Sequence, residues 1–476
     1  MIKNVQEHFG EELSNKEKEL INNGKKWALT YGLVRGFGDE FGEQTTYLPF
    51  SLYPSKLEAS KLQKAYSIQE AYNEMYYNIA MDVNFLLSTL SSTRQTDPFI
   101  DSLCKIQENK LVFNRKQLIT MAIFRNDMMV DSERQNQLTQ VEFNVISIAF
   151  ISQAQTINKL HLYQFPNLKT LQISESPIKA IALALKVNVT SNEYYKNQQH
   201  FSVLFVVLKN ESNFADQIKF EQELKAQIPN FKCIGYVTLA DIYENSTIEN
   251  EKDLIYDGIK IHMVYFRAGY SPDHYSTEKE WIARTRIEQS VDCIKCPNVA
   301  MQLAGMKRVQ AELVKPGVFS KFFPSRYSDI IRENVYSTFT DMFSLDNSCD
   351  IKTALEVVQT ANYLMKPSTE GGSGENISSL TKIKNILNES KDTSKYILQK
   401  KIVPPAYENV LVVPGHIPQR VNAVSELGIF GLIIADKNGE IRANSKCGYL
   451  LRTKSKNVEK GGVSTGYSVL DSIETL

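Results

Sequence analysis

The sequence of 476 residues predicts a mixed α/β protein, of the α+β kind, that contains a parallel-sheet unit. Residues 201–237 carry two continuous apolar runs around a helical segment, and strands joined by such a crossover run parallel. Residues 140–147 alternate polar and apolar side chains, which is the period of a half-buried strand. Residues 59–96 repeat apolar side chains at three- and four-residue steps, which predicts a helical segment with one apolar face.

The other predicted elements follow in chain order. Residues 15–25 have the periodicity of a helix, and residues 186–200 are polar and irregular, which predicts a linker. Beyond the parallel-sheet unit, the pattern predicts a strand at 261–266, helices at 299–314 and 378–393, and strands at 396–402 and 410–413.

The C-terminal part predicts a hairpin. An apolar segment at 425–434 is followed by Asn438-Gly439, the signal of a type I′ turn. The return strand ends at 449–454 and places Arg452 and Lys454 on one face, because alternate side chains of a strand share a face.

Composition excludes several classes of partner. The 54 basic and 54 acidic side chains balance, so electrostatics gives no reason to expect nucleic acid or an acidic membrane. The first twenty residues lack the apolar core of a signal peptide, and no apolar run has the length of a membrane span. The single C-x-x-C, Cys293 with Cys296, has no second pair, which favours buried thiols over a zinc or redox site. We therefore expect a protein of the cytoplasm.

Two glycine-rich loops indicate a polyanionic ligand. Lys366 ends an apolar strand and precedes Pro367, so it should stay extended. The following loop, 368–376, has three glycines that can offer bare N–H groups to phosphate, although its spacing is not that of a P-loop. A flexible glycine-serine turn is the alternative interpretation of this stretch. A second glycine loop at 461–466 follows Arg452 and Lys454, and both loops could close over a ligand as mobile lids.

Strand ends supply further polar groups. Glu142 and Asn144 share one face of their strand and present two oxygens suited to Mg²⁺. Arg125 follows an apolar segment and can hold a carboxylate with two hydrogen bonds. An exposed strand face or a surface ion pair is the alternative for either feature alone.

The loops that leave the parallel strands carry a second polar group of residues. Ligands of such sheets bind beyond the carboxyl ends of the strands, and those loops contain Glu211, Asn213, Gln217, Arg267 and Tyr270. The first three side chains would suit the head group of an α-amino acid.

Together these motifs resemble the eukaryotic-type glutathione synthetases from about Tyr47 to Leu470. Each stretch is weakly specific, but their order and spacing are highly specific; they are Tyr47–Ser55, Glu142–Ser147, Tyr265–Tyr270, Gln302–Lys307, Ser425–Gly431 and Leu450–Lys454.

The resemblance implies an ATP-grasp fold in a homodimer. It implies a substrate-binding domain at 200–304, inserted between the two parts of a catalytic, ATP-binding domain at 1–199 and 305–476. It further implies an ATP-dependent ligase that makes glutathione from γ-glutamylcysteine and glycine through an acyl phosphate, with Mg²⁺ as cofactor. Catalysis in such a reaction is mostly positioning and charge neutralisation.

The resemblance also implies residue roles by matching position. Mg²⁺ would bind Glu142, Asn144 and Glu370. Contacts to ATP fall on Lys307, Lys366, Glu370, Gly371, Gly372, Asn376, Gln399, Lys400, Lys401, Ile402, Glu426 and Lys454. Contacts to the dipeptide fall on Arg125, Ser147, Glu211, Asn213, Gln217, Arg267 and Tyr270. The catalytic residues would be Arg452 and Lys366, with Arg452, Val463 and Ser464 near the acceptor amine.

Some positions depart from the family pattern, and alternatives stay open. Ala149 and Ser378 replace a serine and a tyrosine, Glu375 adds a negative charge near the expected triphosphate, and Ser464-Thr465 replace two small apolar residues. The alternatives are a homoglutathione-type enzyme that uses β-alanine, a non-catalytic nucleotide- or peptide-binding relative, and a generic α/β protein with a serine-glycine linker.

Overall fold

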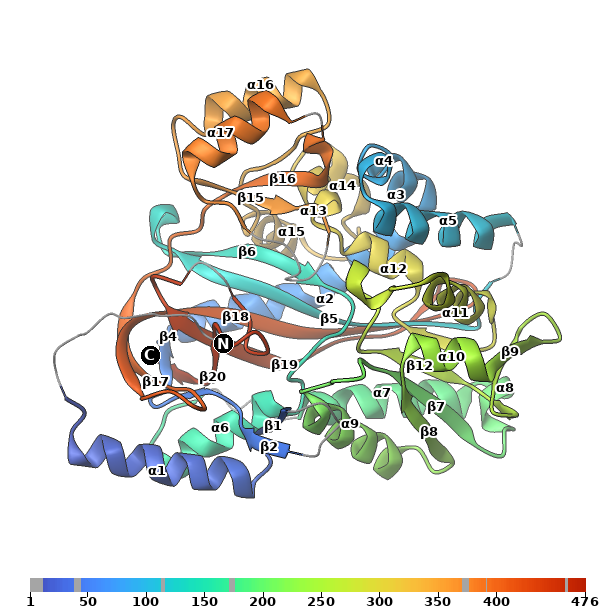
Figure 1. Cartoon of the computed structure of the whole chain (residues 1–476), viewed down its shortest axis with the longest axis horizontal. Helices are drawn as coiled ribbons and strands as arrows, with labels where there is room; N and C mark the ends of the chain where they lie inside the picture. The colour runs from blue at the N-terminus through green and yellow to red at the C-terminus, as the bar shows by residue number, and fades with distance from the viewer. Residues whose placement is uncertain are drawn as a thin grey trace.

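The chain folds as the mixed α/β protein that the sequence predicts (Figure 1). The computed structural model describes residues 12–37, 44–112, 116–170, 176–369, 376–390, 392–458 and 461–476. Within these ranges, no helix is both long enough and apolar enough to cross a lipid bilayer.

The largest sheet of the described chain has seven strands in the order β17-β3-β20-β19-β18-β5-β6. One end of it consists of four antiparallel strands, β5 (Ile119–Asp131), β6 (Gln137–Asn144), β18 (Gln419–Asp436) and β19 (Ile441–Ser455). The short strands at its other end are β3 (Phe50–Ser51), β17 (Tyr407–Val412) and β20 (Val469–Asp471).

Both faces of this sheet are covered, which explains the continuous apolar run in β18. Ile429 and Ile433 belong to a core shared with α2 (Ala59–Met81). Phe430 and Leu432 point the opposite way, into a core shared with α6 (Gln153–Gln164) and α7 (Pro177–Ser191). A strand buried on both faces has no polar side to alternate with.

The predicted strand–helix–strand unit is confirmed. A four-stranded parallel sheet has the order β13-β12-β7-β8. Helix α9 (Phe214–Gln227) joins β7 to β8. The strands are β7 (Phe201–Val206), β8 (Phe231–Val237), β12 (Met263–Phe266) and β13 (Ile294–Cys296). Around it lie α10 (Leu239–Asn245), α11 (Glu278–Gln289), β9 (Ser246–Glu249), β10 (Asp253–Tyr256) and β11 (Ile259–Lys260).

A small lobe stands above the large sheet at the top of Figure 1. It has a three-stranded sheet, β14-β16-β15, and two helices that share its core. Its elements are β14 (Met342–Ser344), β15 (Tyr363–Pro367), β16 (Tyr396–Lys400), α16 (Ser348–Val357) and α17 (Leu380–Glu389).

Shorter elements connect these parts. The helices are α1 (Asn15–Thr30), α3 (Val83–Thr89), α4 (Thr93–Thr96), α5 (Pro98–Val112), α8 (Glu193–Lys196), α12 (Val299–Ala304), α13 (Lys307–Leu313), α14 (Val318–Phe322) and α15 (Asp329–Tyr336). The strands are β1 (Val34–Phe37), β2 (Gln44–Tyr47), β4 (Ser55–Leu57) and β21 (Ile473–Thr475).

Two predicted helices are interrupted in the structure. The segment 59–96 is three helices, because α2 ends at Met81 and the side chain of Asp82 then caps α3 by accepting a hydrogen bond from Phe85 N at 3.0 Å. The segment 299–314 divides between α12 and α13, so Lys307 begins a helix instead of lying in the middle of one.

The predicted linker at 186–200 is wrong. It contains the end of α7 and the whole of α8, and the side chain of Asn192 caps α8 by accepting from Tyr194 N at 3.0 Å. The polar residues there form the solvent-facing side of helices whose apolar side packs on the sheet.

The turn between β18 and β19 is not type I′. That turn requires positive φ at both central residues, whereas Gly439 has φ 84° and Asn438 has no positive φ. Gly439 N donates to Asp436 O at 2.9 Å and Asp436 N donates to Glu440 O at 3.0 Å. These bonds close a three-residue loop that ends in a left-handed glycine.

Candidate active site

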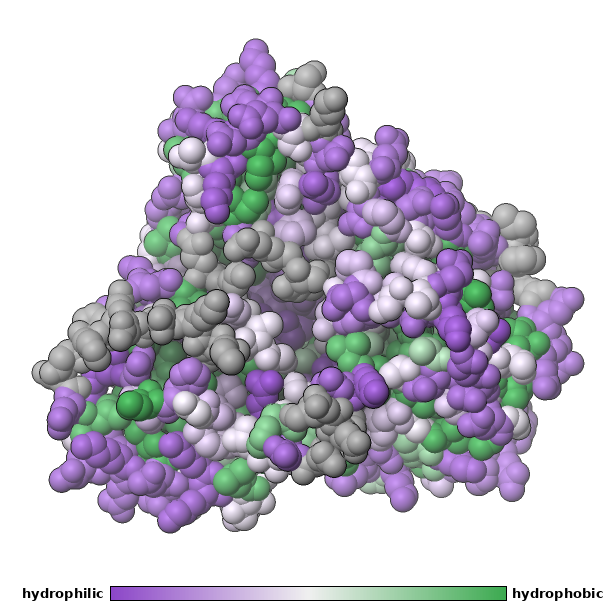
Figure 2. All heavy atoms as spheres, in the orientation of Figure 1, coloured by the Kyte–Doolittle hydropathy of each residue, from purple (hydrophilic) through white to green (hydrophobic). Residues whose placement is uncertain are grey.

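Four central strands bring the predicted charged residues together on one face of the large sheet. Across β5 and β6, Arg125 lies opposite Asn144 and Asp127 lies opposite Glu142. In the neighbouring hairpin Glu426 of β18 lies opposite Arg452 of β19. Figure 2 shows that the molecule is hollowed near the centre of the viewed face and that hydrophilic side chains gather there.

Asp127 is the anion that holds this face together. Its fully buried carboxylate accepts from Arg125 Nε at 2.7 Å and Arg125 Nη2 at 2.8 Å. It also accepts from Asn144 Nδ2 and from Arg452 Nη2, each at 2.8 Å. Arg452 Nη2 donates to Glu426 as well. One carboxylate thus fixes two arginines and turns the amide nitrogen of Asn144 inward.

Glycine is required where β18 crosses this ion pair. A Cβ built on Gly428 would come within 2.8 Å of Arg125 Cδ and would also meet a carboxylate oxygen of Asp127. The absent side chain therefore provides the space for the Arg125–Asp127 pair.

The sequence prediction missed Asp127, although a signal for it was present. Arg125 and Asp127 are two residues apart in an apolar strand, so they share a face, by the same alternation that predicted Glu142 and Asn144 as neighbours.

Two lysines from other elements complete the charge cluster. Lys307 Nζ at the start of α13 lies 2.9 Å from Glu142 Oε2 and donates to Thr369 O at 3.3 Å. Lys366 lies in β15, as predicted, and is buried. Burial, with the neighbouring charge of Lys307, lowers the pKa of Lys366 to about 8. Burial alone would raise the pKa of Glu142, but the charges of Lys307, Lys366 and Arg452 hold that pKa well below its usual range.

The donor set at Glu142 and Asn144 fits a magnesium ion. The amide nitrogen of Asn144 donates to Asp127 Oδ2 at 2.8 Å and to Arg125 O at 3.2 Å, which leaves its amide oxygen available as a ligand. The described residues contain no group of three His, Cys, Asp or Glu side chains placed to hold a metal ion, and the third expected ligand, Glu370, lies outside them. Two protein oxygens are too few to fill the coordination sphere of Mg²⁺, so the ion would take its remaining ligands from water and from a bound polyphosphate.

A second group of predicted residues lies beyond the parallel strands. Arg267 follows β12 and its backbone N–H donates to Val206 O at the end of β7 at 2.8 Å. Its buried Nε and Nη1 have no hydrogen-bond partner in the described structure. The same is true of both amide atoms of Gln217 and of Asn213 Oδ1. Buried polar groups are normally hydrogen-bonded, so these orphaned atoms are candidates for contact with a polar ligand.

Other residues of this group are fixed in place. Glu211 accepts from Asn213 N at 2.7 Å, and Ser147 Oγ donates to Arg267 O at 2.8 Å. Ser147 has φ 55°, a left-handed conformation that is uncommon outside glycine and is found at functional sites. Burial raises the pKa of Tyr270, which keeps its phenol protonated at neutral pH.

Gln302 is a further candidate that the prediction left out. It is buried in α12, its Nε2 donates to Gly269 O at 3.0 Å, and its Oε1 has no partner among the described residues. Gly269 lies between Arg267 and Tyr270, so this unpaired oxygen adds to the orphaned atoms of the same loop.

The stretch expected to contact the adenine, 399–402, has only part of its backbone N–H groups available for hydrogen bonds to a ligand. Gln399 Nε2 donates to Val141 O at 3.2 Å, which fastens β16 to β6. Lys400 N and Lys401 N already donate to Asp341 O and Asn362 O, each at 2.9 Å. The N–H of Ile402 therefore remains the best backbone donor in this stretch, and the other two N–H groups do not face a ligand.

The loop residues divide into described and undescribed parts. Glu370, Gly371 and Gly372 lie outside the described residues, whereas Asn376 precedes Ile377, whose backbone pairs with Met365 beside Lys366.

The second glycine loop is closed on itself. Val463 is buried, but Ser464 and Thr465 are exposed, and Thr465 Oγ1 donates to the carbonyls of Gly461 and Gly462 at 3.0 Å. Ser464 O accepts from Arg35 Nη1 at 3.4 Å. In this arrangement Val463 lies inward and the two hydroxyl residues do not line a closed pocket.

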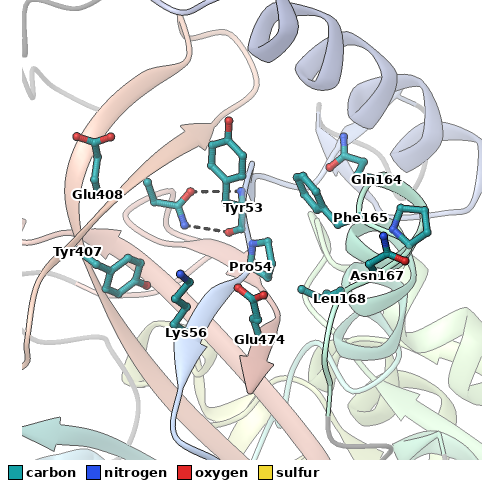
Figure 3. Close-up of a pocket in the computed structure, with 12 residues that line it drawn as sticks. Tyr53, Pro54, Lys56, Gln164, Phe165, Asn167, Leu168, Tyr407, Glu408 and Glu474 are labelled. Carbon is teal, nitrogen blue, oxygen red and sulfur yellow. Dashed lines mark hydrogen bonds between the residues drawn. The ribbon is translucent and has the colours of Figure 1, made fainter. Parts of the chain in front are cut away.

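A separate cavity of about 700 Å³ contains none of the predicted site residues (Figure 3). Tyr53, Phe165 and Tyr407 line it, and Asn409 holds the backbone of Tyr53 through hydrogen bonds of 3.3 and 2.9 Å. It lies at the β17 end of the large sheet, away from the charge cluster.

Comparisons with known proteins agree with this geometry. The profile of the family described as eukaryotic glutathione synthase, ATP binding domain, matches residues 14–474. The chain is 32% identical to the glutathione synthetase of Homo sapiens over 480 residues, which cover 98% of both proteins. It is 31% identical to the chloroplastic glutathione synthetase of Arabidopsis thaliana over 469 residues, which cover 96% of this chain and 85% of the plant protein.

A solved structure supports the fold. The apo form of a glutathione synthetase-like effector from Globodera pallida matches with a TM-score of 0.76 over 98% of both chains, at 22% identity. The family match supports the expected ATP-grasp ligase, and the expected resemblance is confirmed along nearly the whole chain. The chain belongs to the eukaryotic glutathione synthase family.

Proposed function

We propose that this protein is an ATP-dependent glutathione synthase, which joins γ-glutamylcysteine to glycine and releases ADP and phosphate. The observation that carries the proposal is the pairing of two sites: a buried cationic cluster at the centre of the large sheet, and orphaned polar atoms beyond the neighbouring parallel strands. The first suits a triphosphate and a reacting carboxylate, and the second suits the polar ends of a peptide. Membership of the family supplies the reaction.

ATP would bind between the small lobe and the large sheet. Lys366 and Lys307 would neutralise its phosphates, and the N–H of Ile402 would read the adenine. Glu142, Asn144 and Glu370 would hold Mg²⁺, which would supply charge neutralisation at the phosphates when bound. Glu426, Asn376 and Lys454 would adjoin the same space, as the family resemblance implies.

γ-Glutamylcysteine would satisfy the orphaned atoms. Arg267 Nε and Nη1 would donate to a carboxylate, while Gln217 and Asn213 would bond the α-amino and α-carboxylate groups of the γ-glutamyl end. Arg125 would hold the cysteinyl end near the charge cluster, because Asp127 fixes its guanidinium there at 2.7 Å.

The reaction would then proceed in two steps. A cysteinyl carboxylate oxygen attacks the γ-phosphorus of ATP and ADP leaves, which forms an acyl phosphate. The glycine amine attacks the acyl carbon, loses a proton, and phosphate leaves as the amide bond forms. Arg452 would neutralise the oxygens that gain charge in both steps, and Asp127 keeps it oriented.

Coupled ADP release tests the proposal. Turnover with γ-glutamylcysteine plus glycine, well above turnover with β-alanine and with no acceptor, is the expected result. Equal or faster turnover with β-alanine would favour the homoglutathione-type alternative. Nucleotide binding without ADP release under any acceptor would favour a non-catalytic relative, a role that a fold alone does not exclude.

The loop at 461–466 should tune acceptor choice. Replacing both Ser464 and Thr465 by alanine removes two hydroxyls, one of which closes the loop on itself at 3.0 Å. The ratio of kcat/KM for glycine over β-alanine should change by roughly tenfold, the size of a one-methylene discrimination, while KM for ATP stays constant. An unchanged ratio would remove this loop from the acceptor pocket.

A homodimer, a cytoplasmic location and the domain division at 200–304 complete the proposal. They rest on family resemblance, and the related proteins of Arabidopsis thaliana and Solanum lycopersicum are named chloroplastic. Sedimentation of the purified chain at several concentrations would test the dimer.

A further inference from the structure

A second large cavity, of about 960 Å³, lies at the far end of β5 from the charge cluster. The residues that line it belong to α5, the end of α11, β13 and the turn that joins β18 to β19. Figure 1 shows α5 and α11 on the right of the molecule. Thr120 lines it, and Arg125 is five residues further along the same strand, which separates the two places by about 17 Å at the rise of a strand. The cavity is therefore distinct from the proposed active site.

The floor of this cavity carries an excess of buried positive charge. Glu288 is paired with Lys110 at 2.8 Å and with Arg284 at 3.1 Å. Lys295 of β13 lies beside them and is only 1% exposed, yet the acceptor recorded for its ammonium is a backbone carbonyl, that of Ser290. Three cations thus share one carboxylate in a region with little solvent, where an unbalanced charge is unfavourable.

The other charges near the cavity do not remove this excess. Asp292 is engaged by Lys252 at 3.2 Å. At the rim, Asp436 is paired with Arg442 at 2.6 Å. The other rim charges, Glu251, Lys437 and Lys116, are exposed to solvent and therefore screened. Burial and the charge of Lys110 lower the pKa of Lys295 to about 8, and the neighbouring carboxylates of Glu288 and Asp292 offset only part of this shift.

A hydrogen-bond acceptor faces the same space. Gln107 of α5 lines the cavity, is 4% exposed, and its Oε1 has no partner within the described residues. An amide oxygen can only accept, so its missing partner is a donor. Among the described residues, the buried ammonium of Lys295 has no ion-pair partner of its own and the buried oxygen of Gln107 has no donor, and together they define the complementary ligand.

We propose that this cavity is a second ligand site, which binds a small carboxylate that also carries a hydroxyl or ammonium donor. The carboxylate pairs with Lys295 and Lys110, and the donor bonds Gln107 Oε1. The volume falls in the range of pockets that enclose small molecules, so the cavity has room for a larger body attached to this head group. The inference does not depend on the proposed catalytic function.

Malate and succinate are matched probes, because they differ only by one hydroxyl. In a ligand-observed NMR titration of the full chain at constant ionic strength, malate should bind saturably and about tenfold more tightly than succinate, since one buried hydrogen bond distinguishes them. Lys295→Met should weaken both acids at least tenfold. Gln107→Met should remove the preference for malate and leave succinate nearly unchanged.

Lys56→Met is the matched control, because Lys56 lines the separate cavity of Figure 3 and should leave malate binding unchanged. If Lys295→Met does not fold, the Gln107→Met comparison carries the test alone. Malate affinity that is equal in wild type and Lys295→Met, or a preference for malate that survives Gln107→Met, would overturn the proposal, as would no saturable malate binding.

Discussion

Replacing Asp127 by asparagine should lower the turnover of the enzyme while preserving the shape of the charged face that β5, β6, β18 and β19 form. Asp127 Oδ2 accepts three of the four hydrogen bonds that converge on this carboxylate, from Arg125 Nη2, Arg452 Nη2 and Asn144 Nδ2, each at 2.8 Å. The fourth, from Arg125 Nε at 2.7 Å, ends on Oδ1. An asparagine can keep the fourth bond with its oxygen, but its NH₂ group would then meet three donors.

The structure sets the size of the effect. Removing one partner of a buried ion pair costs about 3–5 kcal/mol, and Glu426 still pairs with Arg452, so we expect a loss near the lower end, about 3 kcal/mol of unfolding free energy. Without the charge of Asp127, the guanidinium of Arg452 would move toward Glu426. A displacement of about 1 Å at a reacting centre lowers the rate by roughly a hundredfold. We therefore expect kcat to fall about a hundredfold in a protein that still folds.

The assay is ADP release under saturating substrates, beside a denaturant titration of the same preparations. Asp131→Asn is the matched control: Asp131 is buried in the same strand, but its Oδ1 accepts from the backbone N–H groups of Glu133 and Val403 at 3.2 and 3.3 Å. Its kcat should stay within a few fold of wild type. Near-wild-type turnover of Asp127→Asn would refute the argument that this carboxylate positions the arginines.

Three further outcomes follow from the same site. Arg267→Ala should raise KM for γ-glutamylcysteine far more than KM for ATP, because truncating a buried charge contact costs roughly 2–5 kcal/mol of binding free energy. Steady-state kinetics in which each substrate is varied in turn measures both constants. Because burial lowers the pKa of Lys366 to about 8, kcat/KM for ATP should fall as pH rises through about 8, where the ammonium loses its charge, and Lys366→Arg should flatten that profile. Gly428→Ala should displace Arg125 and lower kcat while costing about 1–3 kcal/mol of stability, and a variant with normal kcat would show that the pair has room to move.

The secondary structure was predictable from the sequence wherever apolar residues in a segment followed a single regular spacing. The apolar runs of the parallel strands are confirmed as strands. The alternation in 140–147 is confirmed as a strand only as far as Asn144, and that strand is buried on both faces and not half-buried. The boundaries that failed depend on single local bonds. Asp82 interrupts a helical period because its side chain caps the next helix, and no apolar pattern reports such a bond.

The predicted linker failed for a different physical reason. Residues 186–200 are polar because α7 and α8 expose one side, while Val189 and Tyr195 on the other side are buried against distant strands. Sequence alone does not show which sparse apolar residues will find a partner far along the chain. The same limit hid Gln302, whose unpaired oxygen is visible only in the folded arrangement.

The two halves of the proposed site differ in how their polar groups are satisfied, and this difference has consequences for binding. Around Asp127 the charges already pair with one another, and Lys307 occupies Glu142 at 2.9 Å. If a nucleotide and its metal ion bind there as proposed, these groups would have to exchange partners, and Lys307 would move from the carboxylate of Glu142 toward a phosphate. Polar side-chain atoms of Arg267 and Gln217 are buried and have no hydrogen-bond partner among the described residues. A bound peptide would supply those hydrogen bonds and remove the free-energy cost of the unpaired groups. Dipeptide binding should hence gain more from each hydrogen bond than ATP binding does, and discrimination against peptides that lack one polar group should be strong.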